Sequence, residues 1–213
     1  MRRSIFITLE GPEGSGKSSQ ARALVSALRR RGQRVTALRD PGSTALGRAL
    51  RRVLLHTEAS LSPLEEALLF IGARVALVEE RIAPALRRGR VVVCDRFHDS
   101  TMAYQGFGGQ LDEPRLQRIG RRAIHGVMPA VTLLLDLPVE RGFARLGRSR
   151  DRMERKTLAF HRRLRQGYLR LARREPRRFV VINAAQPPNA VRRRIEAAVL
   201  RRLGLHQSPV TSH

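Results

Sequence analysis

The segment Gly11-Pro12-Glu13-Gly14-Ser15-Gly16-Lys17-Ser18 fits the spacing G-x-x-x-x-G-K-[ST], and it decides the fold of this chain. In such a loop, backbone N–H groups surround nucleotide phosphates, the lysine reaches the outer phosphates, and the last hydroxyl holds Mg²⁺. An apolar run at 5–9 precedes the loop, and a run with helical spacing at 17–31 follows it. A glycine-rich turn without a ligand does not account for this context. The sequence therefore predicts an ATP-binding segment from Gly11 to Ser19, with a helix N-terminus aimed at the phosphates.

Lysine is rare in this chain, which makes its position in the loop informative. Of the 42 basic residues, 40 are arginine, and lysine stands only at Lys17 and Lys156. A guanidinium is a planar fork, whereas an ammonium is a compact point charge that fits between two phosphate groups. We therefore interpret Lys17 as a residue required by the chemistry of the loop.

Length and charge limit the class of protein. A chain of 213 residues can bury a sizeable core, and we expect one domain over 1–206 with a short lid at about 145–152 and a disordered tail at 207–213. The net charge of +24, taken alone, favours nucleic acid or anionic surfaces as partners. The arginines are spread along helical segments, however, so we expect solvated helix faces and no specific nucleic-acid partner.

Cysteine content and apolar runs indicate the compartment. The single cysteine, Cys94, lies in the apolar run 91–94, which excludes an intrachain disulfide and fits a reducing cytosol. The apolar run after Arg2 and Arg3 ends at Glu10 and is too short for an export signal. No apolar run approaches the roughly 18 residues of a membrane helix. We expect a soluble, cytoplasmic protein without a membrane partner.

Short apolar runs alternate with segments of helical spacing along the chain, which predicts an α/β fold with a five-stranded parallel sheet and helices on both faces. The predicted strands cover 5–9, 34–38, 91–94, 131–135 and 179–182. The predicted helices cover 17–31, 44–56, 62–88, 112–126, 138–146, 152–174 and 188–203. Ligands of such sheets lie outside the carboxyl ends of the strands, so the residues that follow each strand are the candidates for the site.

Arg39 and Asp40 follow the predicted strand at 34–38, and Asp95 and Arg96 follow the one at 91–94. Asp95 ends a fully apolar strand, where a carboxylate is costly unless it is paired or lies near a metal, and Mg²⁺ on the nucleotide phosphates would satisfy it. Arg96 and Arg39 would then face the same crevice and could grip a second phosphate group. The alternative is that these arginines form structural ion pairs with Asp40 and Asp95.

Phe70 and Arg74 are four residues apart in an apolar helical run and therefore share a helix face. An arginine in such a run needs a partner, and a base stacked on Phe70 with a carbonyl facing Arg74 would supply one. The alternative is a core phenylalanine beside a buried salt bridge.

Together these segments resemble the bacterial type of thymidylate kinase from about residue 4 to residue 203. The match rests on 9–14, 39–44, 70–74, 95–97, 100–105 and 151–154, which fall in the order and spacing of that family. The resemblance implies a P-loop nucleoside monophosphate kinase-like fold. It implies phosphorylation of dTMP to dTDP with ATP and Mg²⁺, and it implies a homodimer.

The family resemblance also implies roles for individual residues. It places eight at the acceptor nucleotide: Glu13, Arg39, Phe70, Arg74, Arg96, Thr101, Tyr104 and Gln105. Arg39 and Arg96 would hold the acceptor phosphate, and Phe70 would stack on thymine with Arg74 at O4. Thr101 would contact the base edge, Glu13 the sugar 3′-OH, and Tyr104 would exclude ribonucleotides. Lys17, Asp95 and Arg96 would act in catalysis, with Ser18 and Asp95 at Mg²⁺.

The segment 145–152 resembles a lid that closes over ATP. Because Gly14 leaves the phosphate loop without its own arginine, we expect lid arginines, above all Arg148 and Arg152, to meet the charge on the transferring phosphoryl group. Asp151 and Glu154 fit a helix capping box. Two alternatives remain: another P-loop nucleotide or nucleoside kinase, and a nucleic-acid-binding ATPase that would use the positive charge.

Overall fold

The computed structural model describes residues 4–147 and 150–205, in which five parallel strands form one sheet. The strands are β1 (Ile5–Glu10), β2 (Val35–Arg39), β3 (Val91–Asp95), β4 (Val131–Asp136) and β5 (Phe179–Asn183). Their spatial order is β2-β3-β1-β4-β5, and every neighbouring pair is parallel. The predicted fold class is confirmed, and each strand ends within one residue of its predicted bounds.

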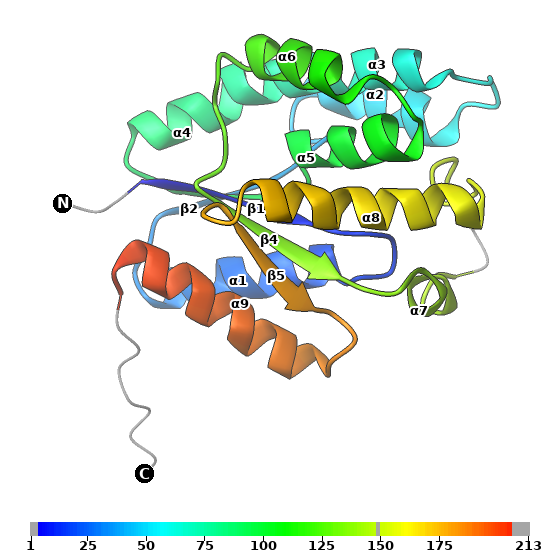
Figure 1. The fold of residues 1–213 in the computed structure, drawn as a ribbon. Helices are drawn as coiled ribbons and strands as arrows, with labels where there is room; N and C mark the ends of the chain where they lie inside the picture. Colours follow the sequence, from blue (N-terminus) through cyan, green and yellow to red (C-terminus); the bar gives the residue numbers. More distant parts are fainter. Residues whose placement is uncertain (1–3, 148–149, 206–213) are drawn as a thin grey trace.

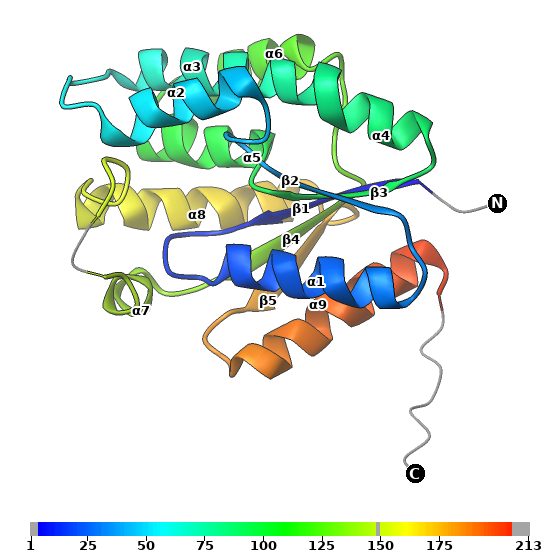
Figure 2. The ribbon, with the colours of Figure 1, turned by 180° about the vertical axis from the view of Figure 1, so that it is seen from behind.

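Helices cover both faces of the sheet (Figures 1 and 2). One face carries α1 (Lys17–Arg30) and α9 (Pro188–Leu203). The opposite side carries α2 (Ala45–His56), α3 (Pro63–Leu77), the π-helical η1 (Val78–Ile82), α4 (Ala83–Arg87), α5 (His98–Thr101), the π-helical η2 (Met102–Gly108), α6 (Glu113–Ala123) and α8 (Leu158–Arg174). The short α7 (Val139–Ala144) follows the carboxyl end of β4.

The core lies on both sides of the sheet. Ile7 and Leu9 of β1 pack with Leu24 of α1, whereas Phe6 packs with Cys94 on the opposite face. Alternate side chains of a strand point to opposite faces, and here both faces are covered. This explains why the strands read as continuous apolar runs in the sequence. Cys94 is buried and free, as predicted.

A helical stretch over 98–108, formed by α5 and η2, lies outside all of the predicted helices. Every residue of this stretch is buried. A helix without a solvent-facing side has no apolar and polar alternation at helical spacing, so the main signal for a helix is lacking. The stretch carries Thr101, Tyr104 and Gln105, and the helix therefore brings these three side chains into one region.

The predicted helix start at 152 is wrong, because α8 begins at Leu158. Thr157 caps it, and its hydroxyl accepts a hydrogen bond from the backbone N–H of Phe160. Asp151 and Glu154 do make the reciprocal bonds of a capping box, each 3.0 Å long. These bonds close a turn over 152–155. The motif therefore marks a turn that precedes the helix by a few residues.

Two other predictions fall partly or wholly outside the described residues. The lid prediction over 145–152 includes Arg148, and the tail prediction covers 207–213. None of the helices within 4–147 and 150–205 is both long enough and apolar enough to span a membrane.

Candidate active site

The phosphate loop joins β1 to α1 and holds Lys17 in a buried position. The ammonium Nζ donates to the carbonyl oxygen of Pro12 at 2.7 Å and to Oγ of Ser15 at 3.2 Å. Burial, with a contribution from nearby Arg96, lowers the pKa of Lys17 to about 8. The lysine thus lies folded onto its own loop, at the position where phosphate oxygens would replace these acceptors.

Ser18 and Asp95 form a pair of oxygen ligands at the start of α1. The hydroxyl of Ser18 donates to Oδ2 of Asp95 at 2.5 Å, and Nε of Arg39 lies 3.9 Å from the same oxygen. A hydroxyl and a carboxylate are hard donors that fit Mg²⁺, which keeps several waters and binds substrate phosphates. The described part of the chain has no group of three or more His, Cys, Asp or Glu that could hold a metal by themselves. The pair therefore fits a cation whose shell is completed by nucleotide phosphates and water.

Gly14 allows the phosphate loop to approach α7 closely. Its φ is +69°, and a Cβ atom at this position would collide with the backbone carbonyl of Gly142. A side chain at position 14 is therefore excluded on two grounds, the left-handed backbone and the contact. An arginine cannot occupy this part of the loop without moving α7.

Arg96 links the phosphate loop to η2. One nitrogen of its guanidinium, Nη2, donates to both carboxylate oxygens of Glu13, at 3.0 and 3.1 Å, and the guanidinium lies over the ring of Tyr104, 4.9 Å from the centroid. The hydroxyl of Tyr104 donates to Glu13. Burial alone would raise the pKa of Glu13, but Arg96, Lys17 and this hydrogen bond lower it to about 2. Glu13 is therefore a carboxylate at every physiological pH.

The backbone of Arg96 is in the left-handed region, with φ of 68°, which is unusual for a residue with a side chain. Glu10 holds the following residues in place, because it accepts from the backbone N–H of Phe97 (2.7 Å), from Ser100 Oγ (2.6 Å) and from the Tyr168 hydroxyl (2.9 Å). Burial raises the pKa of Glu10 to about 7. A strained backbone persists where neighbouring contacts determine its conformation. The left-handed backbone of Arg96 directs its guanidinium toward Glu13.

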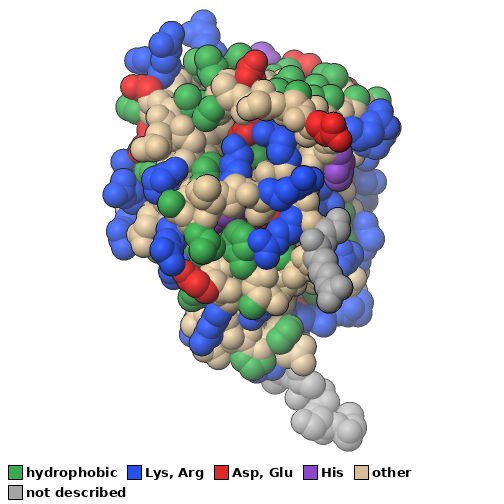
Figure 3. Space-filling view, turned by 90° about the vertical axis from the view of Figure 1, so that its right-hand side faces the viewer, with side chains coloured by type: hydrophobic (Ala, Val, Ile, Leu, Met, Phe, Trp, Pro, Cys, Tyr) green, Lys and Arg blue, Asp and Glu red, His purple; other side chains and the backbone are tan. Residues whose placement is uncertain are grey.

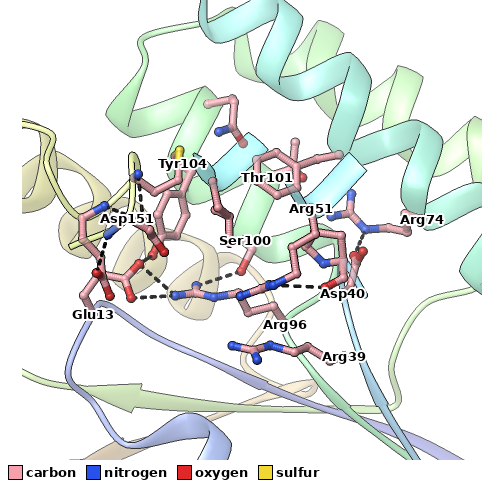
Figure 4. A pocket seen from close by; sticks show the side chains of 16 residues that line it. Glu13, Arg39, Asp40, Arg51, Arg74, Arg96, Ser100, Thr101, Tyr104 and Asp151 are labelled. Atoms are coloured by element: carbon pink, nitrogen blue, oxygen red, sulfur yellow. Dashed lines mark hydrogen bonds and ion pairs between the residues drawn. The ribbon is translucent and has the colours of Figure 1, made fainter. Parts of the chain in front are cut away.

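A pocket with a volume of about 120 Å³ lies between β3, α2, α3 and η2. All eight residues predicted at the acceptor nucleotide line this pocket. They come from distant parts of the chain; Glu13 and Tyr104, for example, are 91 positions apart. Figure 4 shows Arg96 between Glu13 and Ser100, with Arg39 and Arg51 beside it. Lys and Arg side chains also surround a hollow on the face drawn in Figure 3. One end of the pocket is therefore suited to an anion.

The other end of the pocket is a buried polar surface. Nε of Arg74 lies 2.5 Å from Oδ2 of Asp40, and both side chains are almost fully buried. Among the described residues, Arg74 NH1, Asp40 Oδ1, Thr101 Oγ1 and Gln105 Oε1 are buried without a hydrogen-bond partner. Burial raises the pKa of Asp40, and Arg74 opposes that shift. The buried salt bridge that the sequence analysis gave as the alternative is thus present, and Arg74 still keeps one donor group without a partner among the described residues.

The comparison with known proteins follows this geometry. A sequence profile described as thymidylate kinase matches residues 9–195. The chain belongs to the thymidylate kinase family. The thymidylate kinase of Deinococcus radiodurans is 46% identical over 204 residues, with 95% of this chain and 99% of that protein covered. The thymidylate kinase of Thermomicrobium roseum is 47% identical over 199 residues, with 92% and 94% covered. The crystal structure of thymidylate kinase from Ehrlichia chaffeensis matches with a TM-score of 0.76 at 30% identity, covering 92% of this chain and 99% of that one.

In this member of the thymidylate kinase family, the described lid arginines have partners. Arg152 donates to the carbonyl oxygen of Leu54 at 2.8 Å and to Glu66 at 2.7 Å. Arg145 donates to the backbone carbonyls of Gly14 and Ala184, at 3.4 and 3.2 Å. Arg148 lies outside the described residues. The catalytic role of Arg148 and Arg152 stays a prediction, and Arg152 would have to leave Glu66 to fulfil it.

Sequence reasoning missed Arg51 as a site residue of this family member. Arg51 lines the pocket and donates to the carbonyl oxygen of Pro41 at 3.3 Å. Burial and the neighbouring Arg39 lower its pKa. It stands in α2 with two other arginines, so nothing in the local sequence distinguishes it. Glu66 of α3, which accepts a hydrogen bond from Gln105, was missed because it follows another glutamate in the sequence and has no distinguishing pattern either.

Proposed function

We propose that this chain transfers the terminal phosphoryl group of ATP to dTMP, giving ADP and dTDP, and that dTMP binds in the pocket of Figure 4. The observation that carries this proposal is that the eight acceptor-side residues line one pocket. Three of them, Arg74, Thr101 and Gln105, keep buried polar atoms without a partner among the described residues. Such atoms cost free energy until a ligand satisfies them.

The pocket divides into parts that suit the three parts of dTMP. Arg39, Arg51 and Arg96 would hold the acceptor phosphate, because guanidinium groups bind phosphate oxygens in pairs. Phe70 would stack on thymine, with Arg74 and Gln105 at its polar edge. Tyr104, fixed by its hydrogen bond to Glu13, would close the space beside the sugar.

The reaction needs no general base, because the acceptor is already a phosphate with a second pKa of about 6. One of its oxygens forms a bond to the terminal phosphorus of ATP, and the bond from that phosphorus to the bridging oxygen breaks, so ADP leaves with the electron pair. Lys17 and a lid arginine would stabilise the charge on the transferring group. Ser18 and Asp95 would hold Mg²⁺, which when bound neutralises phosphate charge.

Arg148 and Arg152 remain the two candidates for the lid arginine. Arg152 is an ion-pair partner of Glu66 at 2.7 Å, while Lys156 contacts the same Glu66 oxygen at 2.7 Å. If Arg152 moved away to contact ATP, Glu66 would therefore still be paired with Lys156. In the sequence, Arg148 lies between Gly147 and Arg150. The guanidinium of Arg150 makes a cation–π contact with the ring of Phe143.

We also propose a homodimer through the outer face of α2, α3 and α6, which lie together on the side away from α1 and α9 (Figure 1). Large apolar side chains on these helices are 43% to 53% exposed: Leu46, Val53, Leu64, Leu68 and Ile119. Such a patch on neighbouring helices suits a second copy of the same face. Light scattering tests it: Leu68→Glu should give monomers, whereas Val181→Glu, at an exposed apolar residue of β5, should not. A wild-type monomer at micromolar concentration would contradict it.

The activity is tested by ADP release with each nucleoside monophosphate as acceptor. We expect dTMP to be the best substrate and dUMP the second, because one methyl group in an apolar pocket is worth about 10 to 200-fold. Equal turnover of AMP or dCMP would point to another nucleotide kinase. ATP hydrolysis that requires DNA and no monophosphate would point to the nucleic-acid-binding class.

A further inference from the structure

The buried carboxylate of Glu66 accepts hydrogen bonds from three side chains, which come from two distant parts of the chain. It lies on α3 with 1% of its surface exposed. Oε1 accepts from Arg152 at 2.7 Å and from Lys156 at 2.7 Å, and Oε2 accepts from Nε2 of Gln105 at 2.9 Å. An isolated buried carboxylate is costly, and two cations offset that cost here. The charge of Glu66 is therefore maintained behind the wall of the acceptor pocket.

Lys156 is the second of the two lysines in a chain with 40 arginines. Its ammonium contacts Glu66 and lies 5.0 Å from the centroid of the Phe160 ring. Two cations share one carboxylate oxygen at this point, and a compact ammonium fits beside the planar guanidinium of Arg152. Like Lys17, Lys156 thus stands where a point charge is required.

Glu66 determines which end of the Gln105 amide faces the pocket. An ionised carboxylate can only accept hydrogen bonds, so the NH₂ group of Gln105 turns toward it. The amide carbonyl then points the other way, and Oε1 is buried without a partner among the described residues. Gln105 lines the same pocket as Arg74, whose NH1 is an unpartnered donor. Two residues that line the pocket therefore carry one unpartnered donor and one unpartnered acceptor.

We propose that Glu66 is a positioning residue that fixes the Gln105 amide with its carbonyl toward the base, and so favours thymine and uracil over cytosine. Thymine offers the acceptor O4 and the donor N3–H, which match Arg74 and the Gln105 carbonyl. Cytosine offers an amino donor in place of O4 and an acceptor at N3, so both contacts would be reversed. This inference rests on the proposed function.

The test is the ratio of kcat/KM for dTMP to kcat/KM for dCMP in Glu66→Gln. An amide at position 66 can donate to the Gln105 carbonyl, which lets the Gln105 amide turn over and present its NH₂ group to the base. We expect the ratio to fall by about 10 to 100-fold, the discrimination of one correctly paired base edge. The KM for dTMP should rise, because the Gln105 amide is no longer held in one orientation. Glu80→Gln, at an exposed carboxylate further along the same helical stretch, should leave the ratio unchanged.

Two more variants separate this role from a structural one. Gln105→Leu should lower the ratio to a similar extent, and Glu66→Gln added to it should cause no further fall, because coupled residues are not additive. If Glu66→Gln alone folds poorly, Glu66→Gln combined with Lys156→Met removes opposite charges together and should give the same loss of ratio. A wild-type ratio in folded Glu66→Gln would overturn the inference. A wild-type enzyme without preference for dTMP would instead refute the proposed function.

Discussion

The candidate site has an acceptor side, where dTMP would bind, and a donor side, where ATP would bind. The two sides differ in how their charged side chains are paired. On the acceptor side, Arg74 is fixed by Asp40, and Arg96 is fixed by Glu13. On the donor side, the Lys17 ammonium hydrogen-bonds, within the described part of the chain, only to acceptors of its own loop, and part of the predicted lid falls outside that part. Ion pairs between distant segments fix the side chains of the first region. In the second region, nucleotide phosphates would be the natural partners of the Lys17 ammonium.

From this difference we expect substrate selectivity to depend on the acceptor side and the rate of phosphoryl transfer to depend on the donor side. A pocket that is already formed can select its ligand in the ground state, so substitutions there should change substrate affinity, specificity and stability. A region completed by the ligand contributes mainly when charge develops in the transition state. Substitutions there should lower kcat and leave the affinity for dTMP nearly unchanged.

The largest effect is expected in the lid. We expect replacement of Arg148 or Arg152 by Ala to lower kcat by about 10³ or more, because an arginine at the transferring phosphoryl group contributes on that order. The KM for dTMP should be nearly unchanged. Steady-state kinetics on single Ala variants at 145, 148, 150 and 152 checks this. The lid hypothesis is wrong if all four keep wild-type kcat or lose only dTMP affinity.

On the acceptor side, Arg74→Leu should destabilise the fold by about 3 to 5 kcal/mol, because it leaves the buried carboxylate of Asp40 unpaired. Thermal unfolding should then show a Tm lower by about 10 °C for a chain of this size. The double variant Arg74→Leu with Asp40→Leu should recover part of that loss, since no buried charge remains. An unchanged Tm in Arg74→Leu would mean that the ion pair does not stabilise the pocket.

For the phosphate loop, Lys17→Ala should lower kcat by on the order of 10² to 10³, the effect of removing one preorganised donor at a developing charge. The far-UV circular dichroism spectrum and the affinity for dTMP should stay as in the wild type. A fully active variant would show that the loop is not used as proposed.

A smaller effect is expected in the pH dependence of the enzyme, which should differ between ATP and dTMP. The pKa of Lys17 is lowered to about 8, so its charged form prevails below that pH and is lost above it. Because kcat/KM reports the free enzyme, kcat/KM for ATP should fall about tenfold per unit above pH 8. The pKa of Glu13, about 2, predicts that this carboxylate causes no such break in dTMP binding between pH 6 and 9. A profile for ATP that is flat to pH 10 would contradict the charge state assigned to Lys17.

The sheet and the phosphate loop could be predicted because their signals are local. Continuous apolar runs mark strands buried on both faces, and the loop has a fixed spacing of Gly, Lys and Ser. The family resemblance supplied the acceptor residues, and the structure brings all eight to one pocket. The helical stretch 98–108 could not be predicted, because complete burial removes the helical pattern from its sequence.

The partners of the site residues could not be predicted for a different reason. Asp40 is 34 residues from Arg74, and Glu66 is 86 residues from Arg152 and 90 from Lys156. No local pattern records such pairings. One signal was available and not used: the reasoning that singled out Lys17 among 40 arginines applies equally to Lys156.

The central claim, that the acceptor pocket is formed before ATP binds, is tested most directly by isothermal titration calorimetry of the enzyme with dTMP in the absence of ATP and Mg²⁺. We expect saturable binding of dTMP and binding of dCMP that is weaker by at least about tenfold, since the base edge is read by groups already fixed in place. Binding of dTMP that appears only after ATP and Mg²⁺ are added would contradict the claim. Equal affinity for dTMP and dCMP in the ATP-free enzyme would contradict it as well.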